Sequence, residues 1–539
     1  MRNILYKRNN KYSILTKTAG FVLSAALTIG MAAPGTAYAL RGDSGYEGGI
    51  SSGENPNVTV TSTSSKISYQ YQEPFFLTGV PIVLTGTMTI KKSLKADTKT
   101  GVQTLTTTYD YSVPNANNNS LVRNIVMTTT ITPRENGQKT ETTKLTSASE
   151  TLKLNGTSYF ISKSNPNDYM ISKAITNDYQ PAVSYFAGTL IGKKTYHVGN
   201  SNSADIIVVD STCNTVGYDE YWSTAETQTI KQTITSRKAG QASIVLGNAN
   251  IDISTTTTKQ LKYYENQPEQ ISFEGGYYKT QYNENVLKYT ANLKELDKSG
   301  APTSKTVTYT KSLKLESFPF NDPLVAPNLK KIKGHPAEDS MAIMFGLEAY
   351  KDIDSFNPQE YISRGQFIDA FTKIAPAVPL DPVFKPKTTK TTKTTSSGRK
   401  KTPVVLLFKD VPENSKYYSS INDAANRGMV TTGGNFRPDS KITLAEAVTI
   451  IINSLGLKGL APNPSPVTSF KDNDKIPGYA RASMYVAEKI GLIQEDSKGY
   501  IYPDAKITQA NAARIMKTYI DYMNSGIREE YMERIISYK

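Results

Sequence analysis

Few side chains in this sequence combine the residue type and the spacing that catalysis or metal binding needs. The chain has two histidines, His197 and His335, and one cysteine, Cys213, so a histidine-rich metal site and an intramolecular disulfide are excluded. No nucleophile elbow, zinc-protease helix, phosphate loop or dinucleotide fingerprint is present. The adjacent acids Asp219 and Glu220 are compatible with glycosidase carboxylates, but the separation that this chemistry requires is spatial. We expect no catalytic residue, metal or cofactor.

The polar residues that do recur at fixed spacing stand where helices are predicted to begin. In the stretch from Phe408 to Leu455, apolar residues three and four apart predict two helices joined by a glycine-punctuated loop. Thr443 and Glu446 have the spacing of a capping box at the second helix. Such a unit is too small to bury both apolar stripes by itself.

The same pattern returns twice. It begins again at Phe470-Lys471-Asp472, and an earlier copy runs from Gly334 to a second helix opened by Ile362, Ser363 and Arg364. Because the stripes of one copy need partners, three copies predict one all-α module with a shared core.

At these residues the sequence resembles the S-layer homology module, a triplicated domain that holds bacterial surface proteins on the cell wall. The family's unit passes through Phe-x-Asp-Val, Gly-Ile/Val-x-x-Gly and Phe-x-Pro, and enters its second helix at Ile-Thr-Arg-Ala-Glu. The second copy carries the most specific match (Phe408, Asp410, Val411, Gly428, Val430, Gly433, Phe436, Pro438, Ile442, Thr443, Ala445 and Glu446). The third copy matches more loosely, and the first mainly at His335, Ala337, Glu338, Phe356, Pro358 and Ile362 to Arg364. The resemblance covers roughly the last two-fifths of the chain.

The resemblance implies a function and a set of site residues. It implies that grooves between repeats bind an anionic secondary cell-wall polysaccharide with pyruvylated sugars, and that the arginine of the motif faces the acidic group. A guanidinium at a helix N-terminus suits a carboxylate, and the helix dipole and free N–H groups would add to the attraction. The cell-wall polymer-binding residues expected in this way are Arg364, Asp410, Tyr418, Glu446 and Asp472.

Each of these residues also has a plainer interpretation. Asp410 and Asp472 could cap the first helix of their copies, Glu446 could only close its capping box, and Arg364 could form a surface salt bridge. The positions equivalent to Arg364 in the other copies hold Leu444 and Gln509, which carry no positive charge. The family's tryptophan is replaced by Pro336, by Tyr417 or Tyr418, and by Tyr479. The resemblance therefore supports polymer binding at one groove.

The net charge of +14 does not indicate a nucleic-acid-binding protein, because the charge is concentrated in two segments. Residues 1–39 carry five basic side chains and residues 382–405 carry seven, and neither segment has an acid. The rest of the chain is nearly neutral.

Residues 1–39 have the features of a secretory signal peptide: a basic start, an apolar run from Ala19 to Ala33, and Ala37-Tyr38-Ala39 as a cleavage site. The apolar run is shorter than the roughly 20 residues that span a bilayer, which argues against a membrane anchor. No later segment is apolar enough to cross a membrane. With the resemblance, this predicts a secreted protein at the cell wall or surface of a Gram-positive-type bacterium.

Residues 57–320 are predicted to form an antiparallel β-rich region of one large or two smaller domains. Threonine, tyrosine and serine alternate with aliphatic residues, as in Leu105 to Tyr111 and Ile125 to Thr132. Turns are expected at 115–119, 136–137, 155–156, 165–167, 247–248 and 299–300, and a short helix near 182–190. Trp222, the only tryptophan, is expected in a core rather than stacked on a sugar, and Cys213 as a small buried residue.

The predicted order is a signal peptide (1–39), a flexible lead (40–56), the β-rich region (57–320), repeat 1 (330–376), a Lys/Thr/Pro-rich linker (377–405), repeat 2 (406–458), repeat 3 (468–522) and a helical tail (523–539). The linker lacks apolar periodicity, so we expect an extended spacer that could also touch anionic wall polymers.

The function we expect is non-covalent anchoring of an exported surface protein to the cell wall, with an S-layer or envelope structural role and no enzymatic activity. This predicts self-association into surface arrays. An adhesin-like or carbohydrate-binding protein is the alternative, and it predicts a ligand for the isolated β region. A wall-associated glycan hydrolase is a third hypothesis, and it predicts turnover that a single carboxylate substitution abolishes.

Overall fold

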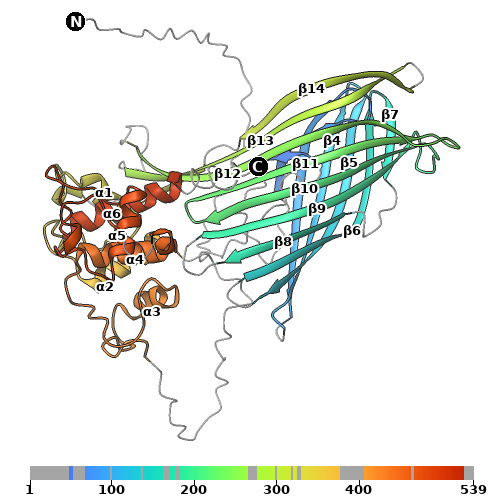
Figure 1. Ribbon diagram of the computed structural model, residues 1–539. Coiled ribbons are helices and arrows are strands. Elements are labelled where there is room, and N and C mark those ends of the chain that lie inside the picture. Colours follow the sequence, from blue (N-terminus) through green and yellow to red (C-terminus); the bar gives the residue numbers. More distant parts are fainter. Residues whose placement is uncertain are drawn as a thin grey trace, which may run out of the picture. The chain divides into compact units, whose positions relative to one another are not determined.

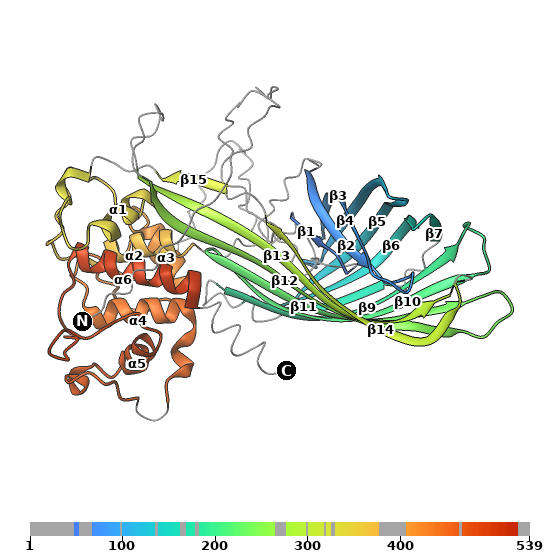
Figure 2. The ribbon, with the colours of Figure 1, turned by 90° about the horizontal axis from the view of Figure 1, so that it is seen from above.

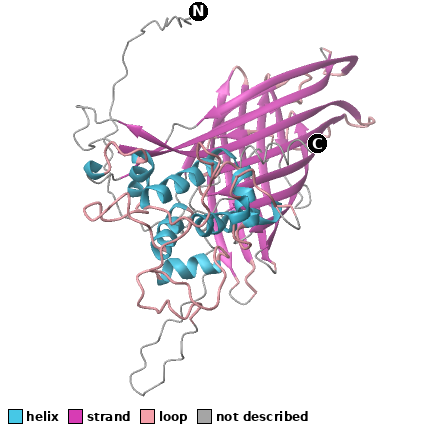
Figure 3. Cartoon of the chain, turned by 60° about the vertical axis from the view of Figure 1, so that its left-hand side comes forward, coloured by secondary structure: helices cyan, strands magenta, loops and turns pink. Residues whose placement is uncertain are grey.

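The structure is a computed structural model in which residues 48–52, 67–97, 100–134, 138–161, 169–177, 183–264, 276–297, 300–316, 320–324, 329–376, 406–462 and 466–526 are described. The expected signal peptide, the 377–405 linker and residues 527–539 of the tail lie outside these ranges, as do the turns expected at 136–137 and 165–167. Strands come from the part of the chain before residue 325 and α-helices from the part after it (Figure 3). Within the described ranges, no helix has the length and apolarity to cross a membrane.

The N-terminal region forms a single antiparallel sheet, in which most neighbours in sequence are neighbours in space (Figure 1). The strands are β1 (Ile50–Ser51), β2 (Ile67–Phe75), β3 (Ile82–Ala96), β4 (Gln103–Ala116), β5 (Asn119–Pro133), β6 (Gln138–Leu154), β7 (Thr157–Ile161), β8 (Tyr169–Asn177), β9 (Val183–Val198), β10 (Ile206–Glu220), β11 (Ser223–Arg237), β12 (Ile244–Tyr264), β13 (Gly276–Leu296), β14 (Pro302–Glu316) and β15 (Phe320–Leu324). The order β1 to β7 continues through β9 to β14, with β8 paired to β6 and β9, and β15 paired to β13. The sequence prediction of an antiparallel β-rich region is confirmed.

The alternation in the sequence sets which face of the sheet is buried. Along β4 the side chains of Leu105, Thr107, Tyr109 and Tyr111 are buried, and those of the alternate residues Thr106 and Thr108 are only partly covered. The same alternation runs through β5. Since successive side chains of a strand point to opposite faces, one face carries the apolar core and the other is largely threonine.

The sheet is strongly curved, so that its inner face wraps around one core (Figure 2). Residues of β14 approach β2, and residues of β13 approach β1. Side chains from β1 to β14 consequently share one hydrophobic cluster, which includes Leu121, Leu152, Ile251 and Leu287, and also the buried Cys213. The described strands thus belong to one sheet with one core.

Turn chemistry explains two of the hairpins. Asn117 and Asn118, between β4 and β5, both have positive φ, as do Asn155 and Gly156 between β6 and β7. Positive φ at both central residues is the type I′ pattern that matches the twist of a hairpin. These two turns are where the sequence predicted them.

Two local predictions in the β region are wrong. The stretch near 182–190 is not a helix, because β9 begins at Val183 and pairs along its length with β8 and β10. Gly247-Asn248 is not a turn but lies inside β12. A Cβ at Gly247 would lie 2.3 Å from the carbonyl oxygen of Asn292, so this glycine permits a close approach of β13 rather than a reversal of the chain.

The C-terminal region is helical. Its elements are η3 (Leu329–Lys331), α1 (Glu338–Gly346), α2 (Arg364–Ile374), α3 (Tyr418–Asn426), α4 (Leu444–Leu455), η5 (Leu457–Leu460), η6 (Asn473–Lys475), α5 (Arg481–Lys489), α6 (Gln509–Asp521) and η7 (Tyr522–Gly526). We refer to residues 329–376, 406–462 and 466–526 as the helical module. Its apolar stripes meet in one cluster that joins Phe367, Phe371, Ile421, Ile451 and Met516.

Candidate functional site

Three isoleucines meet at the centre of the helical module. The backbone N–H of Ile362 donates to the carbonyl of Ile507, that of Ile507 to Ile442, and that of Ile442 to Ile362, at 3.1, 3.2 and 3.1 Å. Each isoleucine precedes the cap of a helix, α2, α4 or α6, and all three are buried. The closed ring of hydrogen bonds brings the N-termini of these three helices together.

The first two backbone N–H groups of each of these three helices donate to carbonyls in the loop that precedes another of the three. In α2, the N–H groups of Arg364 and Gly365 donate to the carbonyls of Ser440 and Pro438 at 2.9 and 2.8 Å. The amides that open α4 and α6 donate in the same way to the loops at 503–505 and 358–360. The third amide of α2 donates to the Ser363 hydroxyl. The expectation that free N–H groups of α2 would assist a ligand is therefore wrong.

The caps of α2 and α4 are built alike. Thr443 accepts from the backbone N–H of Glu446, and the Glu446 carboxylate accepts from the N–H of Thr443 at 2.9 Å, which is the capping box that the sequence predicted. In α2, Ser363 and Gln366 make the same pair of bonds. A neutral glutamine thus closes in α2 the box that a charged glutamate closes in α4.

Glu446 has a second role, because its other oxygen holds Arg364. The Nη1 of Arg364 lies 2.9 Å from Oε1 of Glu446, while Nε donates to the carbonyl of Phe436 at 3.0 Å. The guanidinium also lies over the Phe436 ring, 5.0 Å from its centroid. The two charged side chains remain 19% and 29% exposed, so water or a solute reaches the pair.

Tyr479 lies beside this pair. Its side chain is half exposed and interacts with the side chain of Thr443. Partial burial and, after it, the negative charge of Glu446 raise the pKa of Tyr479. Arg364, Phe436, Glu446 and Tyr479 come from four separate segments, and we call this set the Arg364 junction. Two of its members, Arg364 and Glu446, are among the site residues expected from the sequence, and Tyr479 is expected only as a replacement for the family's tryptophan.

Asp410 and Asp472 are placed differently from Arg364 and Glu446. Asp410 accepts the backbone N–H groups of Phe436 and Arg437, both at 2.7 Å, and Asp472 accepts those of Ile501 and Tyr502 at 3.1 and 2.8 Å. Neither caps a first helix, since α3 and α5 have no side-chain cap. Arg437 and Tyr502 both have positive φ, so each aspartate holds a strained turn before a second helix.

Tyr418 begins α3 and packs partly buried against the helical core. Its neighbour Tyr417 is the residue that reaches α2. A Cβ on Gly365 would lie 2.5 Å from the Tyr417 ring, so only glycine allows this contact. The expected site residues are thus divided: Arg364 and Glu446 touch each other, and Asp410, Asp472 and Tyr418 support the backbone and core around them.

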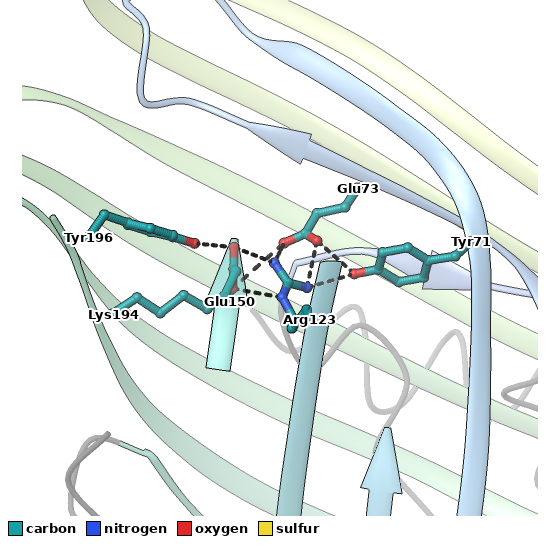
Figure 4. Close-up of polar contacts among 6 residues, drawn as sticks. All are labelled: Tyr71, Glu73, Arg123, Glu150, Lys194 and Tyr196. Carbon is teal, nitrogen blue, oxygen red and sulfur yellow. Dashed lines mark hydrogen bonds and ion pairs between the residues drawn. The ribbon is translucent and has the colours of Figure 1, made fainter. Parts of the chain in front are cut away.

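The β region contains a second polar cluster, which is centred on the buried Arg123 (Figure 4). Arg123 donates to Glu150 through Nε at 2.7 Å and Nη2 at 3.1 Å, and to Glu73 through Nη1 at 2.8 Å and Nη2 at 3.3 Å. Tyr71 donates to Glu73, Tyr196 donates to Glu150, and Lys194 lies 3.9 Å from Glu73. The ion-paired side chains of Arg123, Glu73 and Glu150 are at most 3% exposed.

Burial shifts the protonation of this cluster. It raises the pKa of Glu73 to about 7, although Arg123 acts in the opposite direction, and it lowers the pKa of Lys194 to about 7. This cluster was not predicted from the sequence. A signal was available: Arg123 stands at an inward position of β5, in phase with the buried Leu121, Ile125 and Met127.

The acids that the sequence offered as a glycosidase pair are not placed together. Asp219 and Glu220 are adjacent in β10, so their side chains point to opposite faces. Glu220 is buried and accepts the backbone N–H of Trp222 at 2.7 Å. Among the residues that the structure describes, no group of three histidine, cysteine, aspartate or glutamate side chains could hold a metal ion.

Comparisons with known proteins agree with the helical architecture. The sequence profile of the S-layer homology domain matches residues 407–448 and 469–513. The S-layer protein EA1 of Bacillus anthracis is 34% identical over 113 residues, and the surface-layer 125 kDa protein of Lysinibacillus sphaericus is 22% identical over 212 residues. Exoglucanase XynX of Acetivibrio thermocellus is 28% identical over 120 residues.

These matches cover 20%, 38% and 22% of this chain, and 12%, 16% and 11% of the respective relatives. The chain therefore spans a small part of the length of each of them. The domain match and the similarity to surface-layer proteins support a cell-surface, cell-wall-associated protein with a role in anchoring or in an S-layer. Residues 407–448 and 469–513 of this chain are S-layer homology domains.

Proposed function

We propose that the helical module holds an exported, non-enzymatic surface protein on the wall of a Gram-positive-type bacterium. It does so non-covalently, by binding an acidic secondary cell-wall polysaccharide with pyruvylated sugars at the Arg364 junction. The S-layer homology domains support the anchoring role. One observation carries the choice of site: Arg364 is a positioned, partly exposed guanidinium whose present anionic partner, Glu446, is itself partly exposed.

The module is proposed to consist of three copies of one helix-loop-helix unit, with the first copy in residues 330–376. The ring of Ile362, Ile442 and Ile507 supports this, because the three hydrogen bonds are related by a cyclic permutation of the copies. The equivalents of Arg364 are Leu444 and Gln509, so only the first copy offers a cation to an acidic sugar. The β region is proposed to face outward as the structural part of a surface array.

A ligand carboxylate would have to take the place that Glu446 occupies at Arg364. Bidentate pairing of a guanidinium with a carboxylate is strong and directional, and the exposed side of the pair gives access. Phe436 behind the guanidinium and Tyr479 beside it offer ring surface to the apolar face of a sugar. Glu446 therefore acts as an internal competitor, which the ligand displaces.

The test is sedimentation of the full chain with purified cell walls, before and after removal of the secondary polymer. Wild type should pellet only with intact walls, and Arg364→Ala should stay in solution. Arg514→Ala is the matched control, because Arg514 is an exposed arginine on α6 that is not one of the four residues of the junction, and it should pellet like wild type.

Glu446→Gln sharpens the test. Gln366 closes the same capping box in α2, so this substitution keeps the cap of α4 while removing the charge that holds Arg364. It should leave wall binding intact or tighten it. If Arg364→Ala still pellets, or if Glu446→Gln abolishes binding while the module stays folded, the proposed site is wrong.

A further inference from the structure

The turn between β10 and β11 inserts the only tryptophan of the chain into the helical module. Trp222 is 1% exposed and belongs to the same hydrophobic cluster as Ile374, Tyr519 and Met523. Its indole Nε1 donates to the carbonyl of Ile374, the last residue of α2, at 3.0 Å. The expectation that Trp222 lies in a core is confirmed, and this core includes the helices.

The next residue makes a second bond of the same kind. The hydroxyl of Ser223 donates to the carbonyl of Met523 in η7, at 3.0 Å, and also lies 2.7 Å from Oε1 of Glu220. The Ser223 hydroxyl donates to both acceptors, so its one proton is shared between the carbonyl of Met523 and the carboxyl group of Glu220. Burial raises the pKa of Glu220 to about 8, which agrees with a neutral carboxyl group in this turn.

The helix ends show why these two bonds matter. The last carbonyls of a helix have no partner inside it and must find one elsewhere when they are buried. Helix α4 ends at Leu455 and is capped by Gly456, which adopts a positive φ and whose N–H donates to the carbonyl of Asn453. This end is therefore capped within the helical module. Helix α2 ends at Ile374, and α6 continues into η7. Trp222 donates to the carbonyl of Ile374 beside Arg427, which donates to that of Ala375 at 2.6 Å, and Ser223 donates to the carbonyl of Met523 in η7.

Two further contacts tie the β region to α1. The hydroxyl of Tyr277 in β13 donates to Asp339 in the first turn of α1 at 3.1 Å. At the other end of α1, a Cβ on Gly346 would lie 3.0 Å from the Cβ of Leu324 in β15. Helices α1 and α2 belong to the part of the module that the domain profile does not match. The two helices that the domain profile does not match, α1 and α2, are thus also helices that contact the β region.

We propose that the β10–β11 turn is a built-in partner of the helical module, in which Trp222 donates to the last carbonyl of α2 and Ser223 to the backbone of η7, so that the two regions fold and unfold as one cooperative unit. Arg364 is the first residue of α2 and Ile374 its last. The turn therefore also positions the Arg364 junction, and this part of the inference rests on the proposed function.

The full-length chain carries its own reporter for this contact. Because Trp222 is the only tryptophan, intrinsic tryptophan fluorescence reports solely on the docked turn, and circular dichroism at 222 nm follows mainly the helices. In a urea titration of the full chain, we expect the two transitions to coincide. A shift of Trp222 to solvent-exposed emission at lower urea, with the helical signal intact, would overturn the proposal.

Substitutions give an independent measurement. Trp222→Ala removes a fully buried ring and a helix terminus donor, so the helical transition should move down by about 1 M urea or more. Ser223→Ala keeps the Trp222 ring and removes the hydrogen bond to Met523, so it should shift the helical transition in the same direction by a smaller amount. This variant replaces Trp222→Ala in the test if Trp222→Ala fails to fold. The control is Ile191→Ala, which shortens an exposed side chain of β9 outside the cluster around Trp222. An unchanged helical transition in both test variants would contradict the inference.

Wall binding separates this inference from the proposed function. If both hold, Ser223→Ala should weaken sedimentation with walls under conditions where Arg514→Ala does not. If wild type itself fails to bind walls while the urea transitions still coincide, the proposed function is wrong and the built-in partner remains.

Discussion

Arg123 in the sheet and Arg364 in the helical module both pair with glutamate, but they differ in how far water reaches them. Arg123 is enclosed by two carboxylates and a tyrosine, and its side chain is 0% exposed. Arg364 has one carboxylate and one carbonyl, and remains 19% exposed. The same pair of residue types is a structural tie where water is excluded, and a candidate binding site where water can enter.

The difference follows from what each guanidinium still has to offer. Taking a charge out of water is costly unless its hydrogen bonds are replaced, and Arg123 has contacts on all three of its nitrogens. No exchange with a ligand is possible there without unfolding the sheet. At Arg364, the partly exposed Glu446 can be replaced by another carboxylate at little net cost, because an ion pair that water reaches contributes less than a buried one.

The largest effect should come from removing the buried arginine. Arg123→Met leaves Glu73 and Glu150 close together without their cation, so we expect the free energy of unfolding to fall by about 3–5 kcal/mol. Urea unfolding followed by β-sheet circular dichroism measures this. Arg134→Met replaces an exposed arginine just beyond the same strand and should change stability by less than about 0.5 kcal/mol. Equal effects of the two substitutions would refute the comparison.

The pH dependence of stability should be the next largest effect. Glu73 has a pKa of about 7 in the folded chain and 4.5 as a free side chain, so its contribution is present below pH 4.5 and is lost as pH rises through 7. Lys194 has a pKa of about 7 in place of 10.5, so its neutral form adds stability as pH rises from 7 to 10.5.

Together these groups predict a minimum in the stability of the sheet near pH 7. Urea titrations between pH 5 and pH 10 would show it. Glu73→Gln should remove the fall on the acid side of the minimum and leave the rise on the alkaline side. A profile that is flat for wild type would show that Glu73 and Lys194 do not titrate in this range.

The exposed pair should behave in the opposite way, with a small effect on stability and a large effect on binding. A double-mutant cycle of Arg364→Ala and Glu446→Ala is expected to give an interaction energy below about 1 kcal/mol. The same Arg364→Ala variant should lose wall sedimentation. A coupling of 3 kcal/mol or more in urea unfolding would make the pair a structural tie like that of Arg123.

The smallest effect is expected at Lys441, which reaches between two segments of the module. Its Nζ lies 3.4 Å from Glu360, and both side chains are more than 40% exposed. Lys441→Ala should change the free energy of unfolding by less than about 0.5 kcal/mol, since such pairs are screened by water and salt. Sedimentation of this variant with walls should stay at the wild-type level, which would show that Lys441 does not contribute to wall binding.

Local patterns predicted a large part of this fold because they depend on neighbouring residues. The alternation from Leu105 to Tyr111, the capping box of Thr443 and Glu446, and the turns at Asn117 and Asn155 all involve residues a few positions apart. Where the pattern was ambiguous, pairing decided the outcome. The stretch after Val183 became a strand because β8 and β10 flank it, and Gly247 became a strand residue because β13 comes close.

The sequence by itself determined the two classes of structure, the S-layer homology signature and the presence of one arginine at a second-helix start, because periodicity, caps and motifs are local. Only the tertiary structure decided which charges are buried and what each functional group touches. Arg123 meets Glu73 and Glu150 across 50 and 27 residues, and Trp222 meets Ile374 across 152. Contacts over such separations depend on strand register and helix packing, which no local pattern encodes, and burial then decides whether an arginine and a glutamate stabilise the fold or remain available to a ligand.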